Sequence, residues 1–171
     1  ICDIFDTFFQ YDPFNSNFPE NYIYSTVENM NLSGTWNGKW VKEIDPHYKP
    51  EIYKDQPVLC SGLIYGGINP MNRLMANFFN QDVLGYVEHL WHDQSLLNYV
   101  YHHGYLKDIM KLDMNGNMVS ATLWTFKNKP NKDNLMVVDS PAKGALPSAI
   151  HQYDRVCPCR RYIEKLCPPI G

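Results

Sequence analysis

The segment Val58–Gly67 constrains the fold most, because it reads as a buried strand that leads almost directly into a helix. Val58–Tyr65 is uncharged and mostly apolar, and Gly66-Gly67 closes it. After Asn69-Pro70 the apolar residues recur at helical spacing, which gives the helix an apolar face of Met71, Leu74, Met75, Phe78 and Phe79. A strand followed by an amphipathic helix is the unit of α/β folds.

Other segments continue this alternation. Apolar residues on both faces, or alternating with polar ones, predict strands at Ile1–Phe9, Tyr22–Glu28, Leu106–Leu112 and Asn117–Trp124. We expect a second helix over Gln94–Tyr105, with Leu97, Val100 and Tyr101 inward and Gly104 as its stop. A turn is expected at Asn115-Gly116, whereas residues 29–57 give few periodic signals. The order predicts an α/β fold with a mixed sheet.

Composition narrows the class of protein. The chain has 171 residues, 44% of them apolar and 14% aromatic, which excludes a disordered chain and indicates one domain with a sizeable core. Fifteen basic residues against 18 acidic ones give a net charge of −3, so nucleic acid is not expected as a partner. The longest uncharged stretch, Gln56–Asn72, is interrupted by polar residues, Pro and Gly, and a bilayer requires about 20 apolar residues.

The C-terminal residues 156–171 form a tail rich in Cys and Pro, with Cys157, Cys159 and Cys167 among the five cysteines of the chain. Their spacing matches a zinc site poorly and fits a disulfide in an oxidising compartment better, although the pairing stays open. Asn31-Leu32-Ser33 is an N-glycosylation sequon. Both features favour the secretory pathway.

Three groups of residues suggest chemistry, and the first is the acidic segment that begins at Asp3. Asp3 and Asp6 interrupt an otherwise apolar strand, and burying carboxylates is costly unless a cation or donor meets them. A divalent metal such as Mg²⁺ or Mn²⁺ is one such partner. The alternative is that Asp6 caps a nearby turn or helix and Asp3 pairs with a lysine.

The second group is Asp93-Gln94, which follows Trp91-His92 at the expected start of a helix. Asp93 serves there either as a simple N-cap or as a carboxylate that, with the amide of Gln94, contacts sugar hydroxyl groups. The third is His151, which follows the apolar pair Ala149-Ile150. It is either a core histidine or, if a metal lies at Asp6, a neutral imidazole ligand suited to Mn²⁺.

Together and in this order, these segments resemble the catalytic half of GT-A-type glycosyltransferases, especially the retaining enzymes. Asp6 and the following Phe9-Gln10-Tyr11-Asp12-Pro13-Phe14 resemble the DxD metal motif and the FQxDPF that trails it. Cys60-Ser61-Gly62 resembles the small-residue strand that lines the donor and acceptor pockets, and Trp91–Asn98 resembles a WHDE/Q-S-x-LN segment. His151 stands where several such families have a late metal-binding histidine.

The resemblance implies a fold, a cofactor and a site. It implies a GT-A-like mixed sheet, with Asp6 and His151 as ligands of Mn²⁺ or Mg²⁺, Asp3 as a further candidate, and Ser61 and Gly62 beside the donor. The spacing here is Asp-x-x-Asp, so Ile4 stands at the first DxD position and Asp6 at the second. Asp93 and Gln94 would address the donor sugar, but an amide cannot act as a nucleophile, so Gln94 excludes a covalent glycosyl intermediate at position 94.

The resemblance also divides the chain into a partial catalytic domain, residues 1–155, and the tail, 156–171. The nucleotide-binding half of such enzymes precedes the DxD strand. Because Ile1 begins within an apparent strand, we expect this chain to be part of a longer product whose membrane anchor lies in the missing part. The implied location is the Golgi lumen.

The expected activity is metal-dependent transfer of a sugar, with retention, from a nucleotide donor, most simply a UDP-sugar, to a glycan or glycoprotein. An inert carbohydrate-binding or scaffold protein derived from such an enzyme is the alternative, and a hydrolase using Asp6 and Asp93 is a third. We expect Asp6 at the carboxyl end of a central strand, within a metal's reach of His151. Asp93 and Gln94 should open onto the same cleft at a helix N-terminus.

Overall fold

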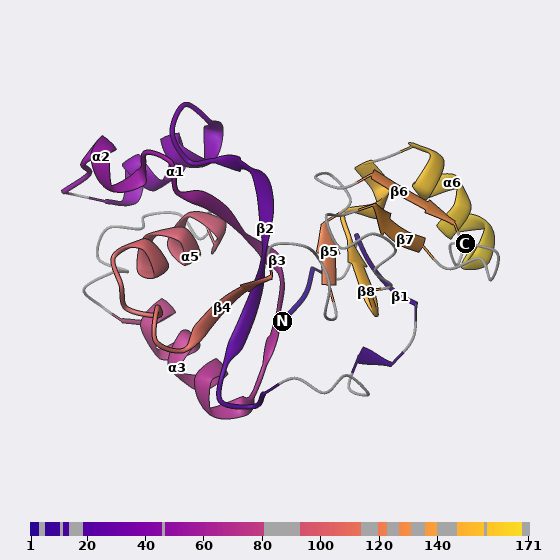
Figure 1. The fold of residues 1–171 in the computed structure, drawn as a ribbon, viewed down its shortest axis with the longest axis horizontal. Coiled ribbons are helices and arrows are strands. Elements are labelled where there is room, and N and C mark those ends of the chain that lie inside the picture. Colours follow the sequence, from indigo (N-terminus) through magenta and orange to yellow (C-terminus); the bar gives the residue numbers. More distant parts are fainter. Residues whose placement is uncertain are drawn as a thin grey trace.

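The computed structural model describes residues 1–3, 6–10, 12–13, 19–45, 47–80, 93–113, 120–122, 127–130, 136–139, 147–155 and 157–168. The fold is mixed α/β with sheets of mixed orientation, as the alternating pattern predicted (Figure 1). None of the described helices combines the length and the apolar character that a membrane crossing demands.

The first sheet carries the main core. Its strand order is β3-β2-β4, in which β2 (Ile23–Asn31) pairs antiparallel with β3 (Pro57–Gly66) and parallel with β4 (Met110–Asp113). Helices α3 (Ile68–Phe78) and α5 (Asp93–His102) lie on one side of this sheet (Figure 1). The buried residues that join the helices to the strands include Ile23, Leu59, Ile64, Leu74, Leu97 and Val100.

A second sheet, ordered β1-β8-β5, lies on the other side of the first (Figure 1). β8 (Ala149–His151) is central among the described strands and pairs antiparallel with β1 (Thr7–Phe9) and parallel with β5 (Ser120–Thr122). β6 (Lys127–Pro130) and β7 (Met136–Asp139) form a separate antiparallel pair. The chain continues through a 3₁₀ turn, Tyr153–Arg155, into α6 (Cys157–Leu166).

Three of the described helices were not expected from the sequence. The first, α1 (Trp36–Ile44), is capped by the hydroxyl of Thr35, which accepts from the N–H of Gly38, and the short α2 (Pro50–Tyr53) follows it. The third, α6, begins at Cys157-Pro158, within the tail rich in Cys and Pro. Proline is tolerated in a first helical turn, because the N–H groups there have no intrahelical partner. Cys167 is a free thiol in this structure.

The N-terminal segment differs from the expected single strand. Cys2 forms a β-bridge with Leu63 of the first sheet, whereas Thr7–Phe9 pairs with the second. The segment therefore contacts the first sheet at Cys2 and Asp3 and belongs to the second sheet from Thr7. The expectation that Asp6 lies at the carboxyl end of a central strand is wrong, since Asp6 directly precedes β1, which is an edge strand among those described. Asp3 and Asp6 thus lie one beside each sheet.

Candidate functional site

The middle of β3 is freed from its neighbour by a shift in register. Ser25 pairs with Ile64, but Val27 pairs with Leu59, so four residues of β3, 60–63, stand opposite one residue of β2. Such bulges release backbone groups for other partners and are common beside functional sites. Here the carbonyl of Gly62 accepts from the N–H of Asp3, and the N–H of Ser61 donates to the side chain of Gln94. The freed stretch thus gathers segments far apart in the sequence.

Asp3, Asp6 and His151 converge next to this stretch. One ligand atom from each residue can be chosen so that all three lie within 4.8 Å of one another. Nδ1 of His151 is 3.2 Å from Oδ1 of Asp6, and Nε2 is 3.8 Å from Oδ2 of Asp3. The expected convergence of Asp6 and His151 is therefore confirmed, across 145 positions of sequence, while metal binding there remains a prediction.

The three residues differ in exposure, which shapes their electrostatics. His151 and Asp6 are buried, whereas Asp3 is exposed. Burial raises the pKa of Asp6, although the nearby His151 opposes this rise. Burial likewise lowers the pKa of His151, against the pull of both carboxylates, so its ring is favoured in the neutral form that ligates metals. Arg155 reaches Asp6 at 3.8 Å from the solvent side.

Gly62 allows this arrangement because His151 packs directly against it. A Cβ added to Gly62 would overlap Nε2 and Cε1 of the His151 ring and would also crowd Oδ2 of Asp3. The sequence assigned Ser61 and Gly62 to the donor site by resemblance. In the structure Gly62 lies directly against His151 and Asp3 and is needed there for its lack of a side chain, whereas Ser61 donates its N–H to Gln94.

The second predicted pair, Asp93 and Gln94, lies at the N-terminus of α5 as expected. Asp93 is exposed, and its Oδ1 accepts from the N–H of the next residue, Gln94, at 2.7 Å, whereas an N-cap side chain accepts from the second or third residue after it. The amide of Gln94 is used inside the protein: Oε1 accepts from Ser61, and Nε2 donates to Asn37 at 2.7 Å and to Glu28 at 3.2 Å. Gln94 thereby links α5, α1, β2 and β3.

Sequence reasoning missed Glu28, Asn37 and Arg155. Glu28 is only 4% exposed, although it was expected merely to end a strand. Burial raises its pKa, while the hydrogen bond from Gln94 and the charge of Arg155 act in the opposite direction. A glutamate at the end of an alternating strand carries no sign of such burial. The one available signal for Arg155 was its place four residues after His151, just beyond Asp154.

Gln10, in the FQxDPF-like segment, has a structural contact. Its Nε2 donates to the carbonyl of Pro147 at 2.8 Å, and its backbone N–H donates to the carbonyl of Ser148. Gln10 therefore fixes the end of β1 to the beginning of β8, which carries His151. Ile4, Tyr11 and Phe14 of the same segment, and Trp91 and His92 before α5, lie outside the described residues.

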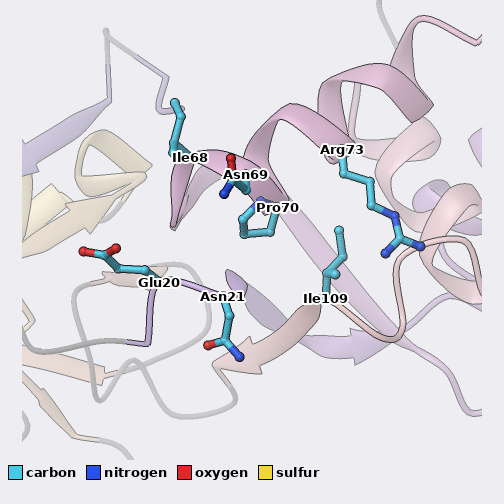
Figure 2. A pocket seen from close by; sticks show the side chains of 7 residues that line it. All are labelled: Glu20, Asn21, Ile68, Asn69, Pro70, Arg73 and Ile109. Carbon is cyan, nitrogen blue, oxygen red and sulfur yellow. The ribbon is translucent and has the colours of Figure 1, made fainter.

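Two pockets lie elsewhere on the described surface. The larger, about 490 Å³, opens at the N-terminus of α3 (Figure 2) and is lined by Glu20, Asn21, Ile68, Asn69, Pro70, Arg73 and Ile109. The smaller, about 250 Å³, is mostly apolar and lies between Cys2, Phe9 and β3. Neither of these two pockets is lined by Asp6, Asp93 or Gln94, so neither is the shared cleft that was expected from the sequence.

No protein-family model, no curated protein and no solved structure matches the chain.

Proposed function

We propose that this chain carries the metal-binding part of a GT-A-type, metal-dependent glycosyltransferase. The observation that carries the proposal is the convergence of Asp3, Asp6 and His151 between two mixed sheets. The resemblance of the surrounding segments supplies the reaction class. In the proposed reaction, a sugar passes from a UDP-sugar to a glycan or glycoprotein acceptor in the Golgi lumen.

The residues present fit a divalent cation. Oδ1 of Asp6 is buried and has no hydrogen-bond partner among the described residues. This carboxylate oxygen is therefore an unsatisfied hydrogen-bond acceptor. Two carboxylates and an imidazole form a mixed oxygen and nitrogen donor set, which suits Mn²⁺ and tolerates Mg²⁺. Asp6 and His151 would hold the ion, with Asp3 closing the set from the exposed side. A cation there would neutralise a diphosphate leaving group.

The resemblance supplies the proposed retaining course, and Gln94 limits the mechanism by which it can proceed. An amide is not a nucleophile, so no covalent sugar ester forms at this position. Asp93, exposed at the start of α5, is a better candidate than Gln94 for contact with substrate, because the amide of Gln94 is held by protein partners. The positive end of the α5 dipole favours an anionic group in this region.

Calorimetric titration tests the proposal. Mn²⁺ should bind to the full chain, and UDP should bind only when Mn²⁺ is present. Asp6→Ala should abolish both, whereas Asp93→Asn should leave Mn²⁺ binding intact and lower transfer activity. If Asp93 is solely a cap, Asp93→Asn leaves activity unchanged, since asparagine caps equally well. Sugar binding without metal would instead support an inert carbohydrate-binding protein and refute the enzyme.

A further inference from the structure

Two helix N-termini meet around the buried carboxyl group of Glu28. Asn37 lies in the first turn of α1 and Gln94 in the first turn of α5, and their side chains are joined by the 2.7 Å hydrogen bond. Nε2 of Gln94 also donates to Oε1 of Glu28 at 3.2 Å. Helix N-termini carry partial positive charge, so this position favours an ionised carboxylate. Burial acts against that charge, which makes the placement of an acidic residue here costly.

Only one of the two carboxylate oxygens of Glu28 is used by the protein. Oε1 accepts from Gln94, while Oε2 has no hydrogen-bond partner among the described residues and is not one of the fully enclosed unsatisfied atoms. A side chain that is 4% exposed thus keeps one acceptor open. Such an acceptor, fixed on one side and free on the other, is suited to receive a hydroxyl group of a ligand.

Glu28 lies close to the Asp3–Asp6–His151 cluster. The side-chain amide of Gln94 donates from its nitrogen to Glu28 and accepts through its oxygen from the N–H of Ser61. A single amide group therefore lies between Glu28 and Ser61. Ser61 is followed by Gly62, against which the ring of His151 packs. The charge of Arg155 acts on both Glu28 and Asp6. Glu28 and the cluster therefore share Gln94, β3 and Arg155 as neighbours, which puts Glu28 among the groups that a sugar on a diphosphate bound at the cluster would meet.

Trp36, next in sequence to Asn37 at the start of α1, is 47% exposed, and its ring packs edge-on against that of Trp40. An exposed indole offers an apolar face to the C–H groups of a sugar, while a carboxylate binds its hydroxyl groups.

We propose that Glu28 binds a hydroxyl group of the donor sugar and that Gln94 and Asn37 are positioning residues that hold its carboxylate. This inference rests on the proposed function. It transfers the contact with the sugar from Gln94, whose polar atoms are occupied, to the carboxyl group that Gln94 orients.

The test compares Glu28→Gln with Glu51→Gln, the same chemical change at an exposed residue of α2. Dissociation constants are measured at saturating Mn²⁺ for UDP, UDP-glucose, UDP-galactose and UDP-N-acetylglucosamine. The quantity of interest is the ratio of each UDP-sugar constant to that of UDP. In Glu28→Gln a neutral amide replaces the carboxylate, so the charge-assisted hydrogen bond to the sugar is lost. The ratio should then rise about tenfold for at least one sugar, while the affinities for Mn²⁺ and UDP stay unchanged. Glu51→Gln should leave every ratio as it is.

Thermal melting establishes that Glu28→Gln is folded. Glu28→Asp, which keeps the charge but withdraws it by one methylene, should raise the same ratio and carries the test if Glu28→Gln does not fold. Unchanged ratios for all three sugars in these variants would overturn the role of Glu28 while leaving the proposed function standing. Absence of Mn²⁺-dependent UDP binding in the unaltered protein would instead overturn both.

Discussion

At the scale of single residues, Gly62 is the position where one atom decides whether the site forms. Gly62→Ala places a methyl group where the ring of His151 lies, so His151 must move away from Asp3 and Asp6. We expect a loss of about 1–3 kcal/mol in the free energy of unfolding, as for other overpacked sites, together with the loss of Mn²⁺ binding. Denaturant unfolding and calorimetry measure the two effects.

Ser61→Ala is the matched control for this substitution. Ser61 contributes its backbone N–H to Gln94, and alanine retains that group. Mn²⁺ binding should therefore be unchanged. Equal metal affinity in both variants would show that the close approach of His151 to Gly62 does not govern the site.

His102 gives the clearest pH dependence of stability. Nε2 of His102 lies 3.1 Å from the carbonyl of Pro57 and donates to it, whereas Nδ1 is buried without a partner in the described part. Burial lowers the pKa of His102 from an ordinary 6.5 to about 4. Between pH 6.5 and pH 4 this histidine is protonated in the unfolded chain but stays neutral in the folded chain. The free energy of unfolding therefore falls as pH drops from 6.5 to 4. One imidazole contributes at most about 3 kcal/mol to this loss.

His102→Gln removes the titrating group while keeping a donor for the carbonyl of Pro57. Urea unfolding of both proteins at pH 7 and pH 4 isolates the contribution of His102 from that of other groups. The variant should lose less stability than the unaltered protein over this range. An identical loss in the two proteins would contradict a neutral, buried His102.

The chemistry of individual residues could be predicted from sequence only where it breaks a local pattern. Asp6 interrupts an apolar run and His151 follows an apolar pair, and these conflicts pointed to one site. Glu28 breaks no pattern, because a glutamate at a strand end is ordinary on an exposed face. Its burial depends on α1 and α5 covering that end of β2, which is tertiary information.

At the scale of elements, Asn98 joins α5 to β3 more tightly than apolar packing does. Its side chain accepts from the N–H of Leu59 and donates to the carbonyl of Leu59, both at 2.9 Å, and it is fully buried. Asn98→Ala leaves both backbone groups without partners at the register shift. We expect a cost of about 2–4 kcal/mol in the free energy of unfolding, measured by denaturant titration.

Asn72→Ala, on the exposed side of α3, is the control for this loss of an amide. Its effect should be small, within about 0.5 kcal/mol, as is usual for surface substitutions. If the two variants were equally stable, Asn98 would not be the link between α5 and β3.

The helices were predicted correctly from the sequence where apolar residues recur clearly at helical spacing. The helix expected after Asn69-Pro70 is α3, with Leu74 fully buried, and the helix expected from Gln94 is α5, which ends before Gly104 with its φ of 94°. Phe79 was assigned to the apolar face of α3 but is 65% exposed, since α3 ends at Phe78. The turn expected at Asn115-Gly116 lies outside the described residues.

The missed helices have weak or misleading local signals. α1 contains Gly38, a poor helix former, and buries Asn37 along with Val41 and Ile44, so its inward face is not apolar throughout. Gly38 is tolerated because its missing side chain lets the helix approach the carbonyl of Leu32. In α6 the prolines and cysteines drew the interpretation toward a disulfide-bearing tail, yet the helix continues to Leu166 and buries Ile163.

At the scale of the whole molecule, the Asp3–Asp6–His151 cluster joins the two sheets. Asp3 is attached to β3 through its backbone, whereas Asp6 directly precedes β1 and His151 ends β8 of the other sheet. A cation held by all three should therefore stabilise the folded chain as a unit. At a concentration 100 times its Kd, it adds about 2.7 kcal/mol, which corresponds to roughly 5–10 °C in Tm.

Thermal melting with and without Mn²⁺ measures this effect. Asp6→Asn should lose the shift, because an uncharged amide replaces the buried carboxylate. Asp108→Asn is the control, since Asp108 pairs with Arg73 on the surface, where ion pairs contribute little. A shift that persists in Asp6→Asn would place the stabilising cation elsewhere.

The pairing of β1 with β8 has a consequence for the timing of folding. Thr7 stands opposite His151 in the ladder, so β1 cannot pair with β8 until residues 149–151 have been synthesised. Local helices and the β2–β3 pair can form earlier, because the closure of a long loop costs entropy before the distant contacts that stabilise it have formed. The side chains of Asp3, Asp6 and His151 can come together only after residue 151 has been synthesised. A cation bound by all three would therefore be absent from any nascent chain that ends before His151.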